Sequence, residues 1–116
     1  VNVSLTTLDL IDNELTDVAA LALADVLKVN GSLTELNLNN NQIGDAGVVG
    51  LAKALEVNAP RKFLWLRLWG YQIGDSGALG LAKALEALEV NASLTILWLG
   101  GNQIGDSGAL GLGKAL

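Results

Sequence analysis

A block of 28 to 31 residues recurs four times along the chain and limits what the chain can fold into. The clearest copies read NNQIGDAGVVGLAKALEVN from Asn40, GYQIGDSGALGLAKALEAL from Gly70 and GNQIGDSGALGLGKAL from Gly101, and a weaker copy, DNELTDVAALALADVLKVN, begins at Asp12. The equivalent positions in the four copies are Asn13, Asn41, Tyr71 and Asn102. Tandem copies of this length indicate an array in which each unit packs mainly on its neighbours.

Each copy divides into an extended half and a helical half. Alternating apolar and variable residues predict short, half-buried strands within residues 5–13, 33–41, 63–71 and 94–102. Leucine and alanine at helical spacing follow, with an aspartate just ahead of each predicted helix: Asp17, Asp45, Asp75 and Asp106. We expect each carboxylate to cap the first N–H groups of its own helix. Four stacked strand–helix units predict an α/β solenoid, with a parallel sheet on the concave face and helices on the convex face.

Small residues recur at two positions of the helical half. The first position holds Ala19, Gly47, Gly77 and Gly108, and the second holds Ala22, Gly50, Gly80 and Gly111. A glycine inside a helix costs about 1 kcal/mol relative to alanine. We therefore interpret these glycines as packing devices at close approaches between helices, or between helix and sheet, and not as ligand sites.

The spacing L-x-x-L-x-L-x-x-N-x-I-G-D-x-G, followed by GLAKAL, resembles the ribonuclease-inhibitor-like class of leucine-rich repeats. That class also occurs in NOD-like receptors and Ran GTPase-activating proteins. The resemblance implies one leucine-rich-repeat domain over residues 1–116, with repeats at about residues 5–32, 33–62, 63–93 and 94–116. Neither end has a polar capping repeat, so we expect a fragment of a longer array or a unit whose ends meet other copies.

Three features depart from the repeat pattern. Tyr71 replaces the anchor asparagine, whose side chain in this family bonds the backbone of adjacent turns, so we expect a modified corner in repeat three. Extra residues at 59–62, which include Pro60, predict a bulging loop. The run at 84–89 duplicates Ala-Leu-Glu and predicts nearly one more helical turn, at about 3.6 residues per turn. The cysteines abundant in ribonuclease inhibitors are missing, which weakens the transfer of that function.

The composition excludes several classes of function. The chain has no cysteine and no histidine, which removes disulfides, thiolate nucleophiles, imidazole bases and the usual transition-metal ligands. A formal net charge of -5 repels nucleic acid. No apolar run approaches the roughly 20 residues that span a bilayer, and the first residues lack the basic start and the apolar run of a signal peptide. We therefore expect a cytoplasmic protein that is not an enzyme, uses no cofactor, and binds neither nucleic acid nor membrane.

The outward positions of the predicted strands indicate a binding surface. In the L-x-L pattern the leucines face the core, so the residues between them face outward on the concave side. Three outward columns result: Thr7, Glu35, Trp65 and Ile96; Asp9, Asn37, Arg67 and Trp98; Ile11, Asn39, Trp69 and Gly100. Trp, Tyr and Arg dominate interface hot spots. We therefore predict a protein-binding patch made of Trp65, Arg67, Trp69, Ile96 and Trp98, with Tyr71 nearby.

Other interpretations of these residues stay open. The aromatic side chains would also stabilise the sheet by stacking across strands, with Arg67 over Trp98 as a cation–π pair. A second, acidic patch at Asp9, Asp12, Glu14 and Glu35 would at most steer a basic partner. The aligned aspartates Asp45, Asp75 and Asp106 do not indicate a metal site, because each has a helix to cap.

Three functions are compatible with the sequence. The leading hypothesis is a recognition scaffold of the NOD-like-receptor type that binds a protein or peptide on its concave face. The alternative is an assembly module that self-associates, for example as a homodimer, through the concave patch or the uncapped ends. The third is a module that regulates a GTPase, with no catalytic residue of its own.

Overall fold

The computed structural model describes residues 4–57, 65–70, 72–87 and 94–116. Within these residues, four strands alternate with four helices. The strands are β1 (Thr7–Asp9), β2 (Glu35–Asn37), β3 (Trp65–Arg67) and β4 (Ile96–Trp98), and the helices are α1 (Asp17–Leu27), α2 (Asp45–Val57), α3 (Asp75–Leu85) and α5 (Asp106–Ala115). The four predicted strand–helix units are therefore present, with strands shorter than the alternating segments that contain them.

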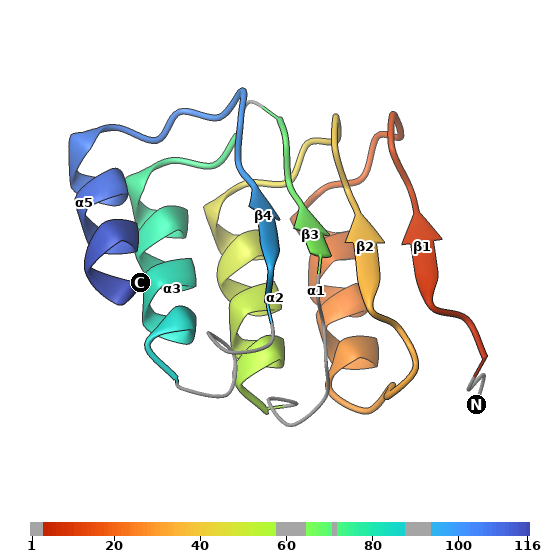
Figure 1. Cartoon of the computed structure of the whole chain (residues 1–116). Helices are drawn as coiled ribbons and strands as arrows, with labels where there is room; N and C mark the ends of the chain where they lie inside the picture. The colour runs from red at the N-terminus through yellow and green to blue at the C-terminus, as the bar shows by residue number, and fades with distance from the viewer. Residues whose placement is uncertain (1–3, 58–64, 71, 88–93) are drawn as a thin grey trace.

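The strands form one parallel sheet in the order β1-β2-β3-β4, and the helices stack in the same order along one side of it (Figure 1). Thr7 pairs with Glu35, Glu35 with Trp65, and Trp65 with Ile96. Backbone hydrogen bonds between repeats continue past the strands, as between the Leu10 N–H and the Asn37 carbonyl at 2.9 Å. The structure confirms the α/β solenoid.

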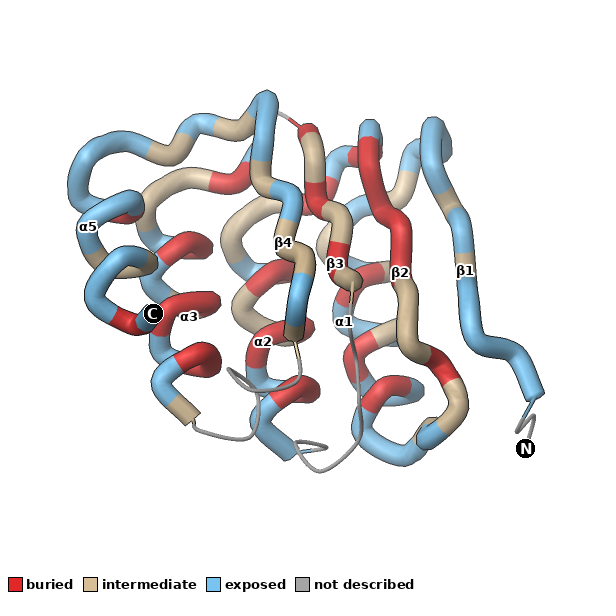
Figure 2. Tube along the Cα trace, viewed as in Figure 1, coloured by how far each residue is buried: buried red, intermediate tan, exposed pale blue. Residues whose placement is uncertain are grey.

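The core lies between the sheet and the helices (Figure 2). Leu36 and Leu66 of the strands and Leu51 and Leu81 of the helices are almost completely buried. The equivalent side chains at the two ends of the sheet, Leu8, Leu10, Leu97 and Leu99, are only half-buried. Each repeat therefore completes the core of its neighbour, and the two end repeats leave theirs partly open.

The first residues of the duplicated Ala-Leu-Glu run, at 84–89, do not lengthen α3. The helix ends at Leu85, and the Ala87 N–H bonds to the Ala84 carbonyl at 3.1 Å, three residues back. Such a tightened bond closes a helix rather than extending it. The expected extra turn is therefore absent over Glu86 and Ala87. The rest of that run, the loop at residues 59–62 and Tyr71 lie outside the described residues.

The prediction that each aspartate caps its own helix was wrong. Asp17 Oδ1 accepts hydrogen bonds from the backbone N–H groups of Gly44 (2.7 Å) and Gly47 (3.0 Å), at the start of the next helix. An N-cap side chain reaches its own first turn from an extended backbone, and that conformation belongs to Thr16, the residue before Asp17. The carboxylate instead caps the neighbouring helix and so ties two repeats together.

The same bonds recur at the following repeats. Asp45 Oδ1 accepts from the N–H groups of Gly74 (2.7 Å) and Gly77 (3.0 Å). Asp75 Oδ1 accepts from those of Gly105 (2.7 Å) and Gly108 (3.0 Å). The sequence lacks any local sign of this arrangement, because donor and acceptor are about one repeat apart.

The glycines leave the space that these contacts need. A Cβ atom on Gly47 would lie 2.5 Å from Asp17 Oδ1, and one on Gly77 would lie 2.6 Å from Asp45 Oδ1. At the second small position, a Cβ atom would overlap an apolar side chain of the preceding helix: Leu21 at Gly50, Val49 at Gly80 and Leu79 at Gly111. The structure confirms the glycines as packing devices.

Candidate protein-binding site

The sheet face is the side of the four strands that faces away from the helices. The register aligns Asp9, Asn37, Arg67 and Trp98 across the four strands. It also aligns Thr7, Glu35, Trp65 and Ile96. The residues of the predicted patch on β3 and β4 therefore lie side by side, and the polar and acidic residues lie on β1 and β2.

The guanidinium of Arg67 lies over two indole rings. Its Cζ atom is 4.8 Å from the ring centroid of Trp65 and 4.8 Å from that of Trp98. The predicted cation–π pair with Trp98 is thus present, and Trp65 supplies a second ring that the sequence analysis did not assign to Arg67. Each such contact stabilises by about 0.5–1 kcal/mol at an exposed site. Part of the patch therefore has a structural role.

Arg67 forms no ion pair with a carboxylate among the described residues. Its Nε atom is buried and has no hydrogen-bond partner among the described residues. The residue opposite Arg67 on β2 is Asn37, whose Oδ1 accepts instead from the Asn39 N–H at 3.0 Å. A buried N–H group without an acceptor costs about 1–3 kcal/mol.

The aromatic side chains at the site differ in exposure. Trp98 is the most exposed of them, with 50% of its surface accessible. Trp65, Arg67 and Ile96 are partly buried. Trp69 packs on the turn that follows β4, since a Cβ atom on Gly100 would lie 2.8 Å from Trp69 Cδ1. Gly101 of the same turn has φ +67°, which favours glycine, and a Cβ there would also meet the Trp69 ring. Trp69 therefore supports the edge of the patch.

Two asparagines predicted to face outward are instead buried. Asn37 is 9% exposed and Asn39 is 7% exposed. Asn39 Oδ1 accepts from the Trp69 N–H at 2.7 Å, so its carboxamide holds the backbone of the next repeat. Asp9, at the position of Asn37, similarly accepts from the Ile11 N–H at 3.1 Å. Asp9 and Asn37 both accept from the backbone N–H two residues on, as short polar side chains commonly do.

The acidic residues of the second patch already have partners within the protein. Asp12 Oδ1 accepts from Asn40 Nδ2 at 2.5 Å, and Glu35 Oε2 accepts from the Thr7 hydroxyl at 3.4 Å. Asp9 and Asp12 are exposed, and Glu35 is half-buried. They supply negative charge on the β1 and β2 side of the sheet face, where Asp9 lies two strands from Arg67 and Glu35 lies on the strand next to it.

Metal-binding clusters and membrane-spanning helices are both absent from the described part of the chain. No group of three or more acidic side chains there is placed to hold a metal ion. None of the described helices has the length and apolar character to cross a bilayer.

Four parallel strands, each followed by a helix on the same side of the sheet, define a repeat solenoid. The family model described as Leucine Rich repeat matches residues 1–24, 29–52 and 90–113, which is more than half of the chain. The chain therefore belongs to the leucine-rich repeat proteins, whose domains generally serve as protein–protein interaction modules and typically as non-enzymatic scaffolds. Most of repeat three lies outside the matched segments. No curated protein matches the sequence closely enough to count as a relative.

Proposed function

We propose that the sheet face over β3 and β4 binds another protein or a peptide, and that Arg67 receives a carboxylate of that partner. The observation that supports this most directly is the position of the guanidinium on the sheet face, 4.8 Å from the rings of both Trp65 and Trp98 and without a carboxylate partner among the described residues. The ribonuclease-inhibitor-like subclass is part of the proposal. It is supported by repeats of 28 to 31 residues whose helices have 10 to 13 residues.

The chemistry of the stack favours a carboxylate. A guanidinium is planar, its donors point outward in that plane, and it can bond a carboxylate through two parallel N–H groups. The indole rings also exclude water, which strengthens the attraction between opposite charges. Trp98 and Ile96 beside the cation supply apolar contact area.

The distribution of charge over the sheet face favours one orientation of a bound peptide. Asp9 and Glu35 lie on β1 and β2, and Arg67 lies on β3. Neighbouring strands are about 4.8 Å apart. An extended peptide that crosses the strands would place basic residues over β1 and β2 and its carboxylate and apolar residues over β3 and β4.

The tryptophans themselves report whether this site is occupied. All three tryptophans of the chain, Trp65, Trp69 and Trp98, lie on or beside it. Peptides selected from a displayed random library on the immobilised protein would be synthesised and titrated, with fluorescence and calorimetry as readouts. We expect selected peptides to contain an acidic residue next to apolar residues and to change the fluorescence on binding.

Variants identify the contacts. We expect Arg67→Gln to weaken binding at least about tenfold, which corresponds to about 1.4 kcal/mol. We expect the double change Trp65→Ala with Trp98→Ala to abolish binding in calorimetry. Val18→Ala is the matched control, because Val18 is a 79% exposed apolar side chain on the helical side.

Two results would contradict the proposal. Equal affinity of the folded double variant would remove the patch as the binding site, and unchanged affinity of Arg67→Gln would remove the carboxylate contact. Light scattering tests the competing self-association hypothesis. A dimer that Trp98→Lys dissolves would mean that the patch contacts a second copy of the chain.

A further inference from the structure

The position of Arg67 on its strand is occupied on β1 and β2 by side chains that make one and the same backbone contact. Asp9 Oδ1 accepts from the Ile11 N–H at 3.1 Å. Asn37 Oδ1 accepts from the Asn39 N–H at 3.0 Å. At this position the fold of the first two repeats therefore uses one oxygen acceptor, which aspartate and asparagine supply equally well.

The amide nitrogen of Asn37 is not used by the fold. The bond from the Asn39 N–H fixes which end of the carboxamide is the oxygen, so Nδ2 faces away from that group. Nδ2 forms no hydrogen bond with a described residue. The one buried side-chain nitrogen or oxygen without a partner among these residues is Arg67 Nε. Nδ2 therefore belongs to the 9% of Asn37 that reaches the surface.

Asn37 also leaves Arg67 without a charged neighbour. The two residues are paired across β2 and β3, and paired strands lie about 4.8 Å apart. An aspartate in place of Asn37 would accept the same N–H group, as Asp9 does, and would place its carboxylate opposite the guanidinium. Opposite charges on paired strands stabilise a sheet. The neutral residue gives up that stabilisation and leaves Arg67 without a counter-ion on the neighbouring strand.

We propose that Asn37 is a second binding residue for the partner's side-chain carboxylate, beside Arg67. The inference rests on the proposed function of the sheet face. A carboxylate offers about four acceptor positions on its two oxygens, so it can accept two N–H groups of the guanidinium and one of Asn37 Nδ2. A carboxamide of the same shape brings its own NH₂ group against these donors. The pair of Asn37 and Arg67 therefore selects Asp or Glu of the partner over Asn or Gln.

The test compares two versions of one peptide. The acid peptide is the tightest peptide selected on the immobilised protein, synthesised with an amidated C-terminus so that it has only side-chain carboxylates. Its amide twin has Asn or Gln at the acidic residue. Both are titrated by calorimetry into the parent chain, Asn37→Asp and Asn39→Asp. Asn39→Asp is the matched control, because it adds the same charge at a carboxamide that contacts the Trp69 backbone and is not paired with Arg67.

We expect the parent to bind the acid peptide at least about tenfold more tightly than the amide twin. Asn37→Asp should weaken the acid peptide at least about tenfold, because the new carboxylate pairs with Arg67 and repels that of the peptide. The same variant should change the affinity for the amide twin by less than about threefold, since its NH₂ group then meets an acceptor. Asn39→Asp should change either affinity by less than about threefold, because solvent screens the more distant charge.

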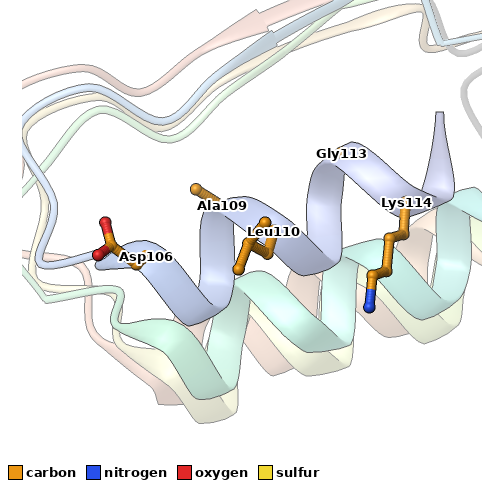
Figure 3. Close-up of a pocket in the computed structure, with 5 residues that line it drawn as sticks. All are labelled: Asp106, Ala109, Leu110, Gly113 and Lys114. Atoms are coloured by element: carbon orange, nitrogen blue, oxygen red, sulfur yellow. The ribbon is translucent and has the colours of Figure 1, made fainter.

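A second control covers binding outside the sheet face. A shallow hollow along helix α5 is lined by Asp106, Ala109, Leu110, Gly113 and Lys114 (Figure 3). Leu110 is its 65% exposed apolar side chain. Leu110→Ala should leave the affinity for both peptides unchanged, and a loss in this variant would place the peptide on α5 and overturn the proposal.

NMR of the parent chain reads the contact directly. The side-chain amide signal of Asn37 should shift when the acid peptide saturates the site. No shift would overturn the proposal, as would undiminished affinity of Asn37→Asp for the acid peptide or an equal loss for both peptides. In these cases the carboxylate contact of Arg67 still stands if the parent prefers the acid peptide. A parent that binds both peptides equally would overturn the proposed function itself, and this inference with it.

Discussion

Replacement of Gly77 by alanine measures how tightly two central repeats pack. In an isolated helix this change would stabilise by about 1 kcal/mol. Here the added Cβ atom would lie 2.6 Å from Asp45 Oδ1, 2.6 Å from Val48 Cγ1 and 2.9 Å from Ile73 Cγ2. None of these atoms is the end of a long, flexible side chain, so the helices must move apart.

The expected net effect is a loss of stability. Overpacking of this kind costs about 1–3 kcal/mol. Movement of Asp45 also weakens its bond with the Gly77 N–H, 3.0 Å long, and hydrogen bonds to charged groups stabilise by about 1.5–3 kcal/mol. After the gain in helix propensity is subtracted, we expect Gly77→Ala to lower the free energy of unfolding by about 2 kcal/mol.

Gly113→Ala is the matched control. A Cβ atom on Gly113 meets nothing within 4 Å, and the equivalent positions of α2 and α3 already hold Ala52 and Ala82. This variant should therefore gain up to about 1 kcal/mol of stability.

Urea unfolding followed by far-UV circular dichroism gives the assay. With a slope of about 1–3 kcal/mol per molar urea, Gly77→Ala should lower the midpoint by about 1 M. Gly113→Ala should raise it. A midpoint for Gly77→Ala equal to or above that of the parent would refute the packing argument.

Two further changes test the polar contacts between repeats in the same assay. Asp45→Ala should lower the free energy of unfolding by about 2 kcal/mol more than Asp106→Ala does. Both aspartates lie at a helix start, but of the two only Asp45 bonds two N–H groups of the next repeat. Equal losses for the two variants would assign the effect to the helix dipole alone. Asn102→Ala should cost about 1–3 kcal/mol, since it leaves the Leu68 carbonyl and the Ile73 N–H without their side-chain partner. A smaller loss than that of the exposed Asn13→Ala, whose side chain bonds only its own turn, would contradict this role.

The fold could be predicted from the sequence because the anchor residues and the apolar positions recur at a regular spacing. Four copies with the same anchor position fixed the number of units, and the alternation within L-x-L fixed which side chains face the core. The register of Thr7 with Glu35, Trp65 and Ile96 then required only that the copies stack without an offset. The columns on the sheet face were predictable for the same reason.

The contacts between repeats did not follow from the sequence. The motif places Asp45 before its own helix, and local capping rules assign it to that helix. Which helix it caps depends on how far one repeat is shifted against the next, and no local pattern encodes that shift. The burial of Asn39 was missed for the same reason, since its carboxamide bonds the Trp69 N–H 30 residues later.

The contact of Arg67 with two indole rings could be predicted only in part from the sequence. Residues two apart on a strand share a face, so Trp65 was a neighbour of Arg67 from its spacing alone. The contact with Trp98 needed the pairing of β3 with β4. The burial of the Nε atom, which has no hydrogen-bond partner among the described residues, could be seen only in the structure.

The glycine pattern gives the array its polarity. A glycine weakens its own helix by about 1 kcal/mol, so the position is favourable only where an aspartate and an apolar side chain of an earlier repeat use the space. Repeats two to four meet that condition and have glycine, and their helices lie against Asp17, Asp45 and Asp75. The first repeat has Ala19 and Ala22 at those positions, which favour the helix and leave no such space. The contacts between repeats therefore have a fixed direction, with the aspartate and the apolar side chain always in the earlier repeat and the glycines in the later one.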